Sequence, residues 1–241
     1  MPLYAVNQCT GAGKQVAAVC GRFVQDRSLA DYVDWLGSTP AGGYDGIPLE
    51  RYNVAPTSKV HVFQGSSDGL LIASLKWGWQ PFWAQGKRQP AINARVETVS
   101  SSKFFRAAWP HRLLVPAAGW YEWVADPADP KHKQPYFIHL KSGEPMFFAG
   151  IGREDEGFVI LTADALGGMV DIHDRRPIVL TPELAKEWMD PETPSARAET
   201  IARDLGTDTE AFEWYTVDRA VGNVRNQGQQ LLLPLDRGPG R

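Results

Sequence analysis

The chain reads Arg-Leu-Leu-Val-Pro-Ala-Ala at residues 112–118 and continues at once as Gly-Trp-Tyr-Glu-Trp at residues 119–123. Short apolar runs of this kind, separated by turn residues and rich in Val, Ile, Phe or Tyr, are typical of strands in an antiparallel meander. Similar runs occur at Val60–Phe63, Leu70–Leu75, Tyr136–Leu140, Pro145–Ile151, Phe158–Thr162 and Pro177–Leu180. The pattern therefore predicts a domain dominated by strands.

Helical signals are few. Residues 28–36 have helical spacing, and Ser28 is the expected N-terminal cap of that helix. A second helix is predicted to begin at Thr181-Pro182-Glu183, because Pro is favoured at the first helical position, and to continue into residues 184–189. Residues 37–48 are rich in Gly and Pro and predict a loop. With 241 residues and no internal repeat, we expect one α+β domain.

Composition narrows the classes of function. The hydrophobic fraction of 43% allows a sizeable core. A net charge of −3 argues against a protein that coats nucleic acid through bulk electrostatics. Residues 76–112, however, contain seven Lys or Arg residues, one acid and seven interleaved Trp or Phe residues. This stretch favours a short nucleic-acid site, although solvated charge beside core aromatics is the alternative interpretation.

Cysteine content and apolar runs indicate the compartment. The two cysteines, Cys9 and Cys20, are too few for a disulfide framework or for a zinc site of their own. No apolar run approaches the roughly 20 residues that span a bilayer, and the first 20 residues lack the apolar core of a secretory signal. We therefore expect a soluble protein of the reducing cytoplasm that has no contact with a membrane.

Four segments contain reactive side chains that the folding pattern alone does not require. Cys20 lies in Val-Cys-Gly-Arg at residues 19–22 and is either an inert, buried small side chain or a nucleophile. In residues 91–97, alternation puts Asn93, Arg95 and Glu97 on one face of an extended segment. Such a face is a site only if it is concave; otherwise it is an ordinary solvated face.

The other two segments carry candidate acids and bases. Glu122 lies inside an aromatic run, so its carboxylate is either turned to solvent on an edge strand or desolvated with a raised pKa. A raised pKa suits proton transfer near neutral pH. His173 has charged neighbours ahead of a predicted strand and could serve as a general acid or base. The alternative is a loop histidine paired with Asp174.

Seven motifs in the same order resemble the SRAP family, the abasic-site processing proteins first named SOS response-associated peptidases. The resemblance runs from about Cys20 to about Pro234. The motifs are Cys20-Gly21-Arg22-Phe23, Arg51-Tyr52-Asn53-Val54-Ala55-Pro56, Trp77-Gly78-Trp79, Asn93-Ala94-Arg95-Val96-Glu97-Thr98, Gly119-Trp120-Tyr121-Glu122-Trp123, Asp171-Ile172-His173-Asp174-Arg175-Arg176-Pro177 and Ala220-Val221-Gly222-Asn223-Val224.

The resemblance implies a fold, a site and a partner. The expected fold is a single domain with a mostly antiparallel, barrel-like sheet and a few flanking helices. The residues that match the family's catalytic positions are Cys20, Asn93, Glu122 and His173. Those that match its DNA-binding groove are Arg22, Asn53, Pro56, Trp83, Arg95, Lys103, Thr162 and Arg175. Some relatives carry Arg at the position of Lys103, which would make a phosphate contact there monodentate. The resemblance implies no metal and no organic cofactor.

The implied activity is covalent capture of abasic sites in single-stranded DNA during the DNA damage response. An N-terminal cysteine is a 1,2-aminothiol, whose amine condenses with the open-chain aldehyde and whose thiol closes a thiazolidine ring. An α-amine with a pKa of roughly 7.7–8.0 is partly neutral at physiological pH, unlike a lysine amine. We expect a monomer, cytoplasmic and associated with the nucleoid when bound to DNA, with autopeptidase activity and a possible lyase activity.

The chain departs from the family at its start. Family members expose the cysteine directly after removal of the initiator Met, whereas 19 residues precede Cys20 here. Translation could begin at Val19 through a GTG codon, the protein could cleave its own Val19–Cys20 bond, or this member is inactive. We favour the first explanation. We accordingly divide the chain into an extension absent from the mature protein (residues 1–19), an SRAP domain (20–235) and a flexible tail (236–241).

Two other functions are compatible with these segments. A cysteine peptidase built on Cys20 and His173 would also need an oxyanion hole and a peptide groove, which the sequence does not locate. A non-covalent module for single-stranded DNA would not need the thiol of Cys20 at all.

Overall fold

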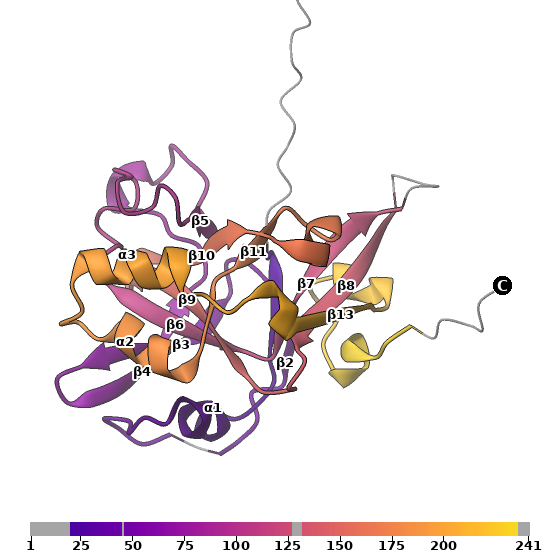
Figure 1. Cartoon of the computed structure of the whole chain (residues 1–241), viewed down its shortest axis with the longest axis horizontal. Coiled ribbons are helices and arrows are strands. Elements are labelled where there is room, and N and C mark those ends of the chain that lie inside the picture. Colours follow the sequence, from indigo (N-terminus) through magenta and orange to yellow (C-terminus); the bar gives the residue numbers. More distant parts are fainter. Residues whose placement is uncertain (1–19, 45, 127–131, 236–241) are drawn as a thin grey trace, which may run out of the picture.

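The computed structural model describes residues 20–44, 46–126 and 132–235 (Figure 1). The boundaries predicted for residues 1–19 and 236–241 lie outside these residues. Two mostly antiparallel sheets form one domain. The smaller sheet has the order β13-β8-β7-β1-β2. Its strands are β1 (Arg22–Gln25), β2 (Arg51–Val54), β7 (Gly119–Ala125), β8 (Lys133–Leu140) and β13 (Phe212–Thr216).

The larger sheet has the order β11-β10-β9-β6-β3-β4, with β12 paired to β9 and β5 paired to β10. Its strands are β3 (Lys59–Ser66), β4 (Gly69–Lys76), β5 (Asn93–Arg95), β6 (Arg112–Ala117), β9 (Met146–Arg153), β10 (Gly157–Asp164), β11 (Arg175–Pro177) and β12 (Val179–Leu180). The predicted α+β class and mostly antiparallel pairing are confirmed, but the strand orders are not sequential, so the sheets are not simple meanders. Within the described residues both sheets keep open edges, so the barrel-like closure is not confirmed.

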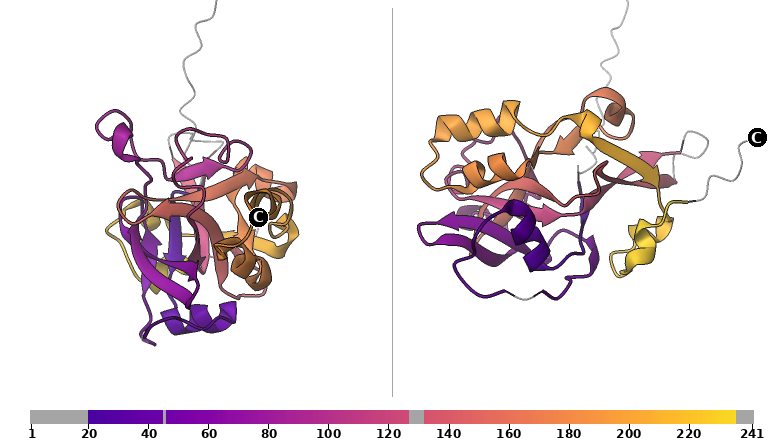
Figure 2. Two further views of the ribbon diagram at one scale, coloured as in Figure 1. Left: turned by 90° about the vertical axis from the view of Figure 1, so that its left-hand side faces the viewer. Right: turned by 60° about the horizontal axis from the view of Figure 1, so that its bottom comes forward.

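Three α-helices, α1 (Leu29–Leu36), α2 (Pro182–Met189) and α3 (Ser195–Asp204), accompany the sheets. Ser28 caps α1 in a capping box with Asp31, as its spacing predicts, and Thr181 caps α2 ahead of Pro182. In Figure 2, α2 and α3 (orange) lie at the opposite end of the molecule from the C-terminal 3₁₀ segments (yellow). Those segments are η4 (Arg219–Gly222) and η5 (Gln229–Leu232), and the others are η1 (Phe82–Ala84), η2 (Gly167–Asp171) and η3 (Thr209–Ala211). No helix of the described residues is long and apolar enough to cross a bilayer.

The stretch at residues 112–123 connects the two sheets. Its first half forms β6 between β3 and β9, whereas its second half forms β7 between β1 and β8. At the crossing, the N–H of Ala118 donates to the carbonyl of Val24 at 2.9 Å. Aromatic side chains fill the space behind the crossing, and Trp120 packs edge-on against Phe148 and Phe212. This buried junction places β1 and β7 side by side, and with them the residues of the site.

Gly119 allows this junction because a side chain has no room there. A β-carbon at Gly119 would lie 2.5 Å from the carbonyl oxygen of Ile138 and 2.4 Å from the ring of Phe137. We expect Gly119→Ala to lower the free energy of unfolding by about 2–3 kcal/mol through overpacking, measured by chemical denaturation. Gly42→Ala, where nothing lies within 4 Å of the added carbon, is the control and should change stability by less than about 0.5 kcal/mol. Equal effects of the two substitutions would show that the crowding at Gly119 does not limit stability.

Candidate functional site

Cys20 lies next to Glu122 because β1 and β7 are paired. The register aligns Arg22 with Tyr121, so the residues just before β1 run alongside Glu122. The backbone N–H of Cys20 donates to Oε1 of Glu122 at 2.6 Å, and the cysteine is fully buried. Burial, with a further contribution from the Glu122 carboxylate, raises the pKa of the Cys20 thiol well above its usual value. The sulfur is therefore a thiol, not a thiolate, at neutral pH.

Glu122 is desolvated, which decides between its two predicted environments. Its side chain is only 2% exposed. Burial raises its pKa to about 8, the hydrogen bond from the Cys20 N–H opposes that rise, and the charge of Asp174 adds to it. At pH 7 the group is mostly a neutral carboxylic acid that can donate a proton, and slightly above pH 8 it becomes a base.

His173 stands in the loop between η2 and β11. Its Nδ1 lies 3.0 Å from the backbone N–H of Arg175 and 2.9 Å from Oδ1 of Asp174. One nitrogen cannot accept from an N–H and donate to a carboxylate at once. In the Nε2–H tautomer Nδ1 accepts from the Arg175 N–H, whereas in the Nδ1–H tautomer or the doubly protonated ring it donates to Asp174. The two contacts therefore do not fix the protonation state of the ring.

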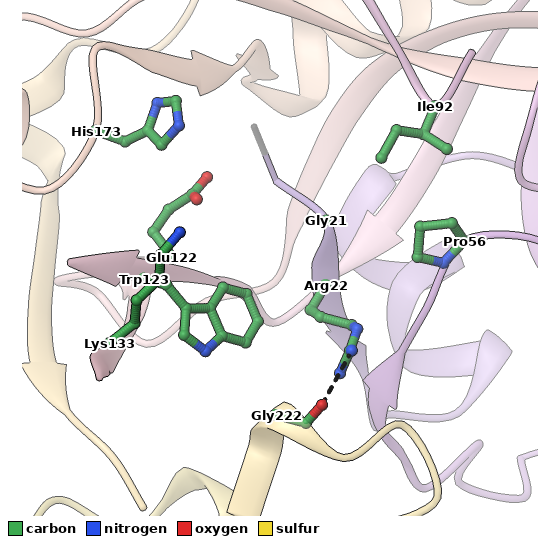
Figure 3. Close-up of a pocket in the computed structure, with 9 residues that line it drawn as sticks. All are labelled: Gly21, Arg22, Pro56, Ile92, Glu122, Trp123, Lys133, His173 and Gly222. Carbon is green, nitrogen blue, oxygen red and sulfur yellow. Dashed lines mark hydrogen bonds between the residues drawn. The ribbon is translucent and has the colours of Figure 1, made fainter. Parts of the chain in front are cut away.

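Glu122 and His173 line a cavity of about 470 Å³, and Cys20 lies directly behind its wall at Gly21. In Figure 3 the carboxyl group of Glu122 points toward the ring of His173, on the side of the cavity opposite Pro56 and Ile92. The lining residues are Gly21, Arg22, Pro56, Ile92, Glu122, Trp123, Lys133, His173 and Gly222. Of the predicted catalytic residues, Glu122 and His173 line it, and Cys20 directly precedes Gly21. The face that carries these groups is concave.

Asn93 and Arg95 reach the neighbourhood on β5. This short strand pairs in parallel with β10, so that Asn93 aligns with Ile160 and Arg95 with Thr162. Asn93 is half-buried and follows Ile92, which lines the cavity, whereas the side chain of Arg95 is exposed. The predicted alternation along this segment is present. Ile92 lines the cavity, whereas Asn93, Arg95 and Glu97 are not among its lining residues.

Several of the predicted DNA-binding residues are engaged within the protein. Arg22 donates to Oδ1 of Asn53 at 2.9 Å and to the carbonyl of Val221 at 2.9 Å. The amide of Asn53, a residue only 2% exposed, donates to the carbonyls of Val221, Asn223 and Asn226, each at 3.1 Å. Arg22 and Asn53 thus hold the C-terminal segment against β1 and β2.

Arg175 is likewise bonded to other groups of the protein. Its guanidinium forms a two-pronged ion pair with Glu97 at 2.7 and 3.0 Å, a contact to Asp164, and a bond at 2.6 Å to the carbonyl of Thr162. Arg175 is only 4% exposed and Thr162 only 2% exposed. These contacts fix β11 against β10, and with it the backbone N–H that meets His173.

The remaining predicted DNA contacts are accessible. Trp83 is 58% exposed and neighbours Phe82, which is 80% exposed. Lys103 is exposed, and Pro56 forms one wall of the cavity. Trp83 also meets Phe104 edge-on at 5.9 Å. Most other Trp residues are buried and pack in the core, whereas Trp83 presents a face on which a base could stack.

Five lining residues were not among the predicted site residues: Gly21, Ile92, Trp123, Lys133 and Gly222. Of these, Trp123 and Lys133 lie on the β7–β8 hairpin, where Ala125 faces Lys133 across the ladder. The lysine sits at the start of β8, next to the undescribed residues 127–131. No pattern in the sequence signals that its side chain is directed to the cavity. The described residues contain no group of three or more His, Cys, Asp and Glu arranged to hold a metal ion.

Comparisons with known proteins give consistent results. The family described as SOS response associated peptidase (SRAP) matches residues 19–224. The chain is 42% identical over 227 residues to the abasic site processing protein YedK of Escherichia coli K12, covering 90% of this chain and 100% of that protein. It is 31% identical over 229 residues to the abasic site processing protein YoqW of Bacillus subtilis, covering 89% and 99% of the two chains.

A solved structure extends the similarity to the fold. A phage-related protein of Bordetella bronchiseptica shares 42% identity and a TM-score of 0.69, covering 83% of this chain and 95% of that one. The family match over residues 19–224 includes Cys20, Glu122 and His173, the three groups brought together at the cavity.

Proposed function

The chain belongs to the SRAP family, and from this membership and the geometry at Cys20 we propose that it senses abasic sites in single-stranded DNA and captures them covalently. One observation carries the proposal. The backbone nitrogen of Cys20 lies 2.6 Å from a carboxyl group whose pKa is about 8, beside a cavity of about 470 Å³. In a chain that begins at Cys20, this nitrogen is the α-amine.

The reaction has two bond-forming steps. The neutral α-amine of Cys20 attacks C1′ of the ring-opened deoxyribose, and loss of water gives an imine. The sulfur then adds to the imine carbon, and the thiol proton passes to the nitrogen as the thiazolidine ring closes. Glu122, once it holds the proton released by the α-amine, supplies the proton that the departing water needs. Its carboxylate, or His173, then relays to the nitrogen the thiol proton that the raised pKa of Cys20 leaves in place.

Four accessible groups have the chemistry to contact a single strand. We propose that Trp83 stacks on a base, that Arg95 and Lys103 approach phosphates, and that Pro56 separates the abasic sugar from the neighbouring stack. Arg22, Asn53 and Arg175 act by holding these surfaces in place. A sugar without a base enters the cavity most readily from a strand that has no pairing partner.

The proposal requires that Cys20 be the first residue of the active chain. Cys20 has a φ of 43°, in the left-handed region, where a residue with a β-carbon is strained by about 1–2 kcal/mol. That torsion no longer exists once nothing precedes the nitrogen, so the strain favours the shorter chain. Translation from Val19 followed by loss of the initiator, or self-cleavage of the Val19–Cys20 bond, would each produce it. An imine on the same nitrogen would also permit β-elimination of the 3′ phosphate, so a lyase activity belongs to the same proposal.

A general cysteine peptidase fits this site less well. Such enzymes rely on a thiolate at a lowered pKa, whereas burial raises the pKa of the Cys20 thiol. Cleavage of only the protein's own Val19–Cys20 bond requires less of the site, because no separate peptide has to be bound.

The test compares residues 20–241, expressed with a removable Met, against residues 1–241. Each is mixed with single-stranded DNA that carries one abasic site, and a denaturing gel and intact mass report the adduct. We expect a stable adduct from the shorter chain, with a mass equal to protein plus DNA minus one water. An adduct from the longer chain should form only with residues 1–19 missing. DNA without an abasic site is the control, and no adduct from either chain would refute the proposal.

A further inference from the structure

Lys133 lies on the wall of the Cys20 cavity, at the mouth of the β7–β8 hairpin. It faces Ala125 across the ladder, while Glu122 faces Tyr136, three residues deeper along the same pair of strands. In Figure 3 the side chain of Lys133 extends from β8 toward the cavity, on the same side as Trp123 and Glu122. A cation on a flexible stem is thus directed at the space where the reacting sugar would lie.

The charge of Lys133 is not used within the described part of the chain. There it forms no hydrogen bond and no ion pair, including none with Glu122, although both line the same cavity. The other cation of the lining, Arg22, is bonded to Asn53 and to the carbonyls of Val221 and Gly222. Lys133 is therefore the lining cation that an anionic ligand would meet.

The chemistry of an abasic strand identifies the anion. The deoxyribose has lost its base, so the phosphodiesters on either side are the charged groups closest to its aldehyde. A lysine ammonium is a compact point charge on a flexible stem, which suits a single phosphate oxygen. We infer that Lys133 binds a phosphate flanking the abasic deoxyribose and so contributes to the affinity of the site for the damaged strand. This inference rests on the proposed function and adds a DNA-binding residue to it.

The test separates binding from chemistry. Chains that begin at Cys20 carry Lys133→Ala, Lys133→Arg, or the control Lys186→Ala, which removes an exposed lysine of α2 outside this cavity. Equilibrium binding is measured with single-stranded DNA containing a tetrahydrofuran abasic analogue, which has no aldehyde, over a range of salt concentrations. Crosslinking to a true abasic site is measured at rising DNA concentrations.

We expect Lys133→Ala to weaken binding roughly three- to tenfold and to make the log–log salt dependence shallower by about 0.7, the value for one phosphate of a single strand. The crosslinking rate at saturating DNA should stay within about twofold of wild type, since the chemistry belongs to other groups. Lys133→Arg should restore both the affinity and the salt dependence, and Lys186→Ala should match wild type.

Two results would overturn the inference. Affinity and salt dependence of Lys133→Ala equal to those of wild type would show that no phosphate is bound there. A loss of saturating rate with unchanged affinity, together with DNA attached to Lys133 after borohydride reduction, would show that its amine condenses with the aldehyde instead. Absence of any crosslink by wild type would refute the proposed function, while the binding measurements with the analogue would still judge Lys133.

Discussion

Replacing Cys20 with alanine in a chain that begins at residue 20 should abolish the adduct that survives heating in detergent. The α-amine is kept, so the imine can still form, but no sulfur is present to close the ring. An imine hydrolyses when the protein unfolds, whereas a thiazolidine persists. We expect the yield of stable adduct to fall roughly 100-fold or more, because a covalent step is lost entirely. Denaturing gels of the reaction with abasic single-stranded DNA measure the yield.

Borohydride reduction distinguishes the amine from the thiol. It converts an imine into a stable secondary amine, so Cys20→Ala should regain an adduct when reductant is present during the reaction. Cys20→Ser should behave similarly, since its hydroxyl closes a less stable ring. A Cys20→Ala chain that keeps one residue before position 20 has an amide nitrogen there, so the adduct trapped by reductant should fall sharply. A heat-stable adduct of Cys20→Ala without reductant would contradict the aminothiol mechanism.

Much of the architecture could be predicted from local pattern. The apolar runs became strands because each has a buried face, and α1 and α2 carry the caps that their sequences contain. Helix α3 was not predicted because its buried face consists only of Ala198, Ile201 and Ala202, too small an apolar stripe to stand out in Ser195–Asp204. The course of residues 112–123 through both sheets also could not be predicted, since it depends on which strands lie beside β6 and β7.

The candidate site shows the same division. The family motifs identified the polar residues, and the environment of Glu122 was one of two that its aromatic neighbours allowed. What sequence could not reveal is how the cations are used. From the sequence, Arg22 and Arg175 are expected to contact phosphates. In the structure both are bonded to groups of the protein itself. Lys133, with no motif around it, also lines the cavity, where the pairing of β7 with β8 places it, and its side chain is not bonded to another described residue.

In the chain that still carries residue 19 before Cys20, the free energy of unfolding should depend strongly on pH. Glu122→Gln should remove that pH dependence. There the carboxyl group faces a neutral amide N–H, and burial holds its pKa at about 8, above the ordinary value of 4.5 that it regains on unfolding. The folded state therefore binds the proton more tightly. The favourable contribution is complete below pH 4.5 and is lost as the pH rises toward 8. Between pH 5 and 8 the wild type should lose about 3.5 kcal/mol relative to Glu122→Gln, with a slope of at most about 1.4 kcal/mol per pH unit. Urea denaturation at a series of pH values measures this difference.

The chain that begins at Cys20 is the matched comparison, because it replaces the neutral amide with an α-ammonium group. An ammonium beside a carboxylate favours the charged form and lowers the pKa of Glu122. The pH dependence relative to Glu122→Gln should therefore shrink to a small fraction of that in the longer chain.

Since the reactive amine must lose its proton before it attacks, that proton can pass to Glu122, which leaves the acid ready for the dehydration step. Glu122→Gln should accordingly slow crosslinking at saturating DNA by about 10²- to 10⁴-fold at pH 7. An equal pH dependence in both chains would show that the nitrogen of Cys20 and the carboxyl group of Glu122 do not exchange a proton, and Glu122 would then have only a structural role.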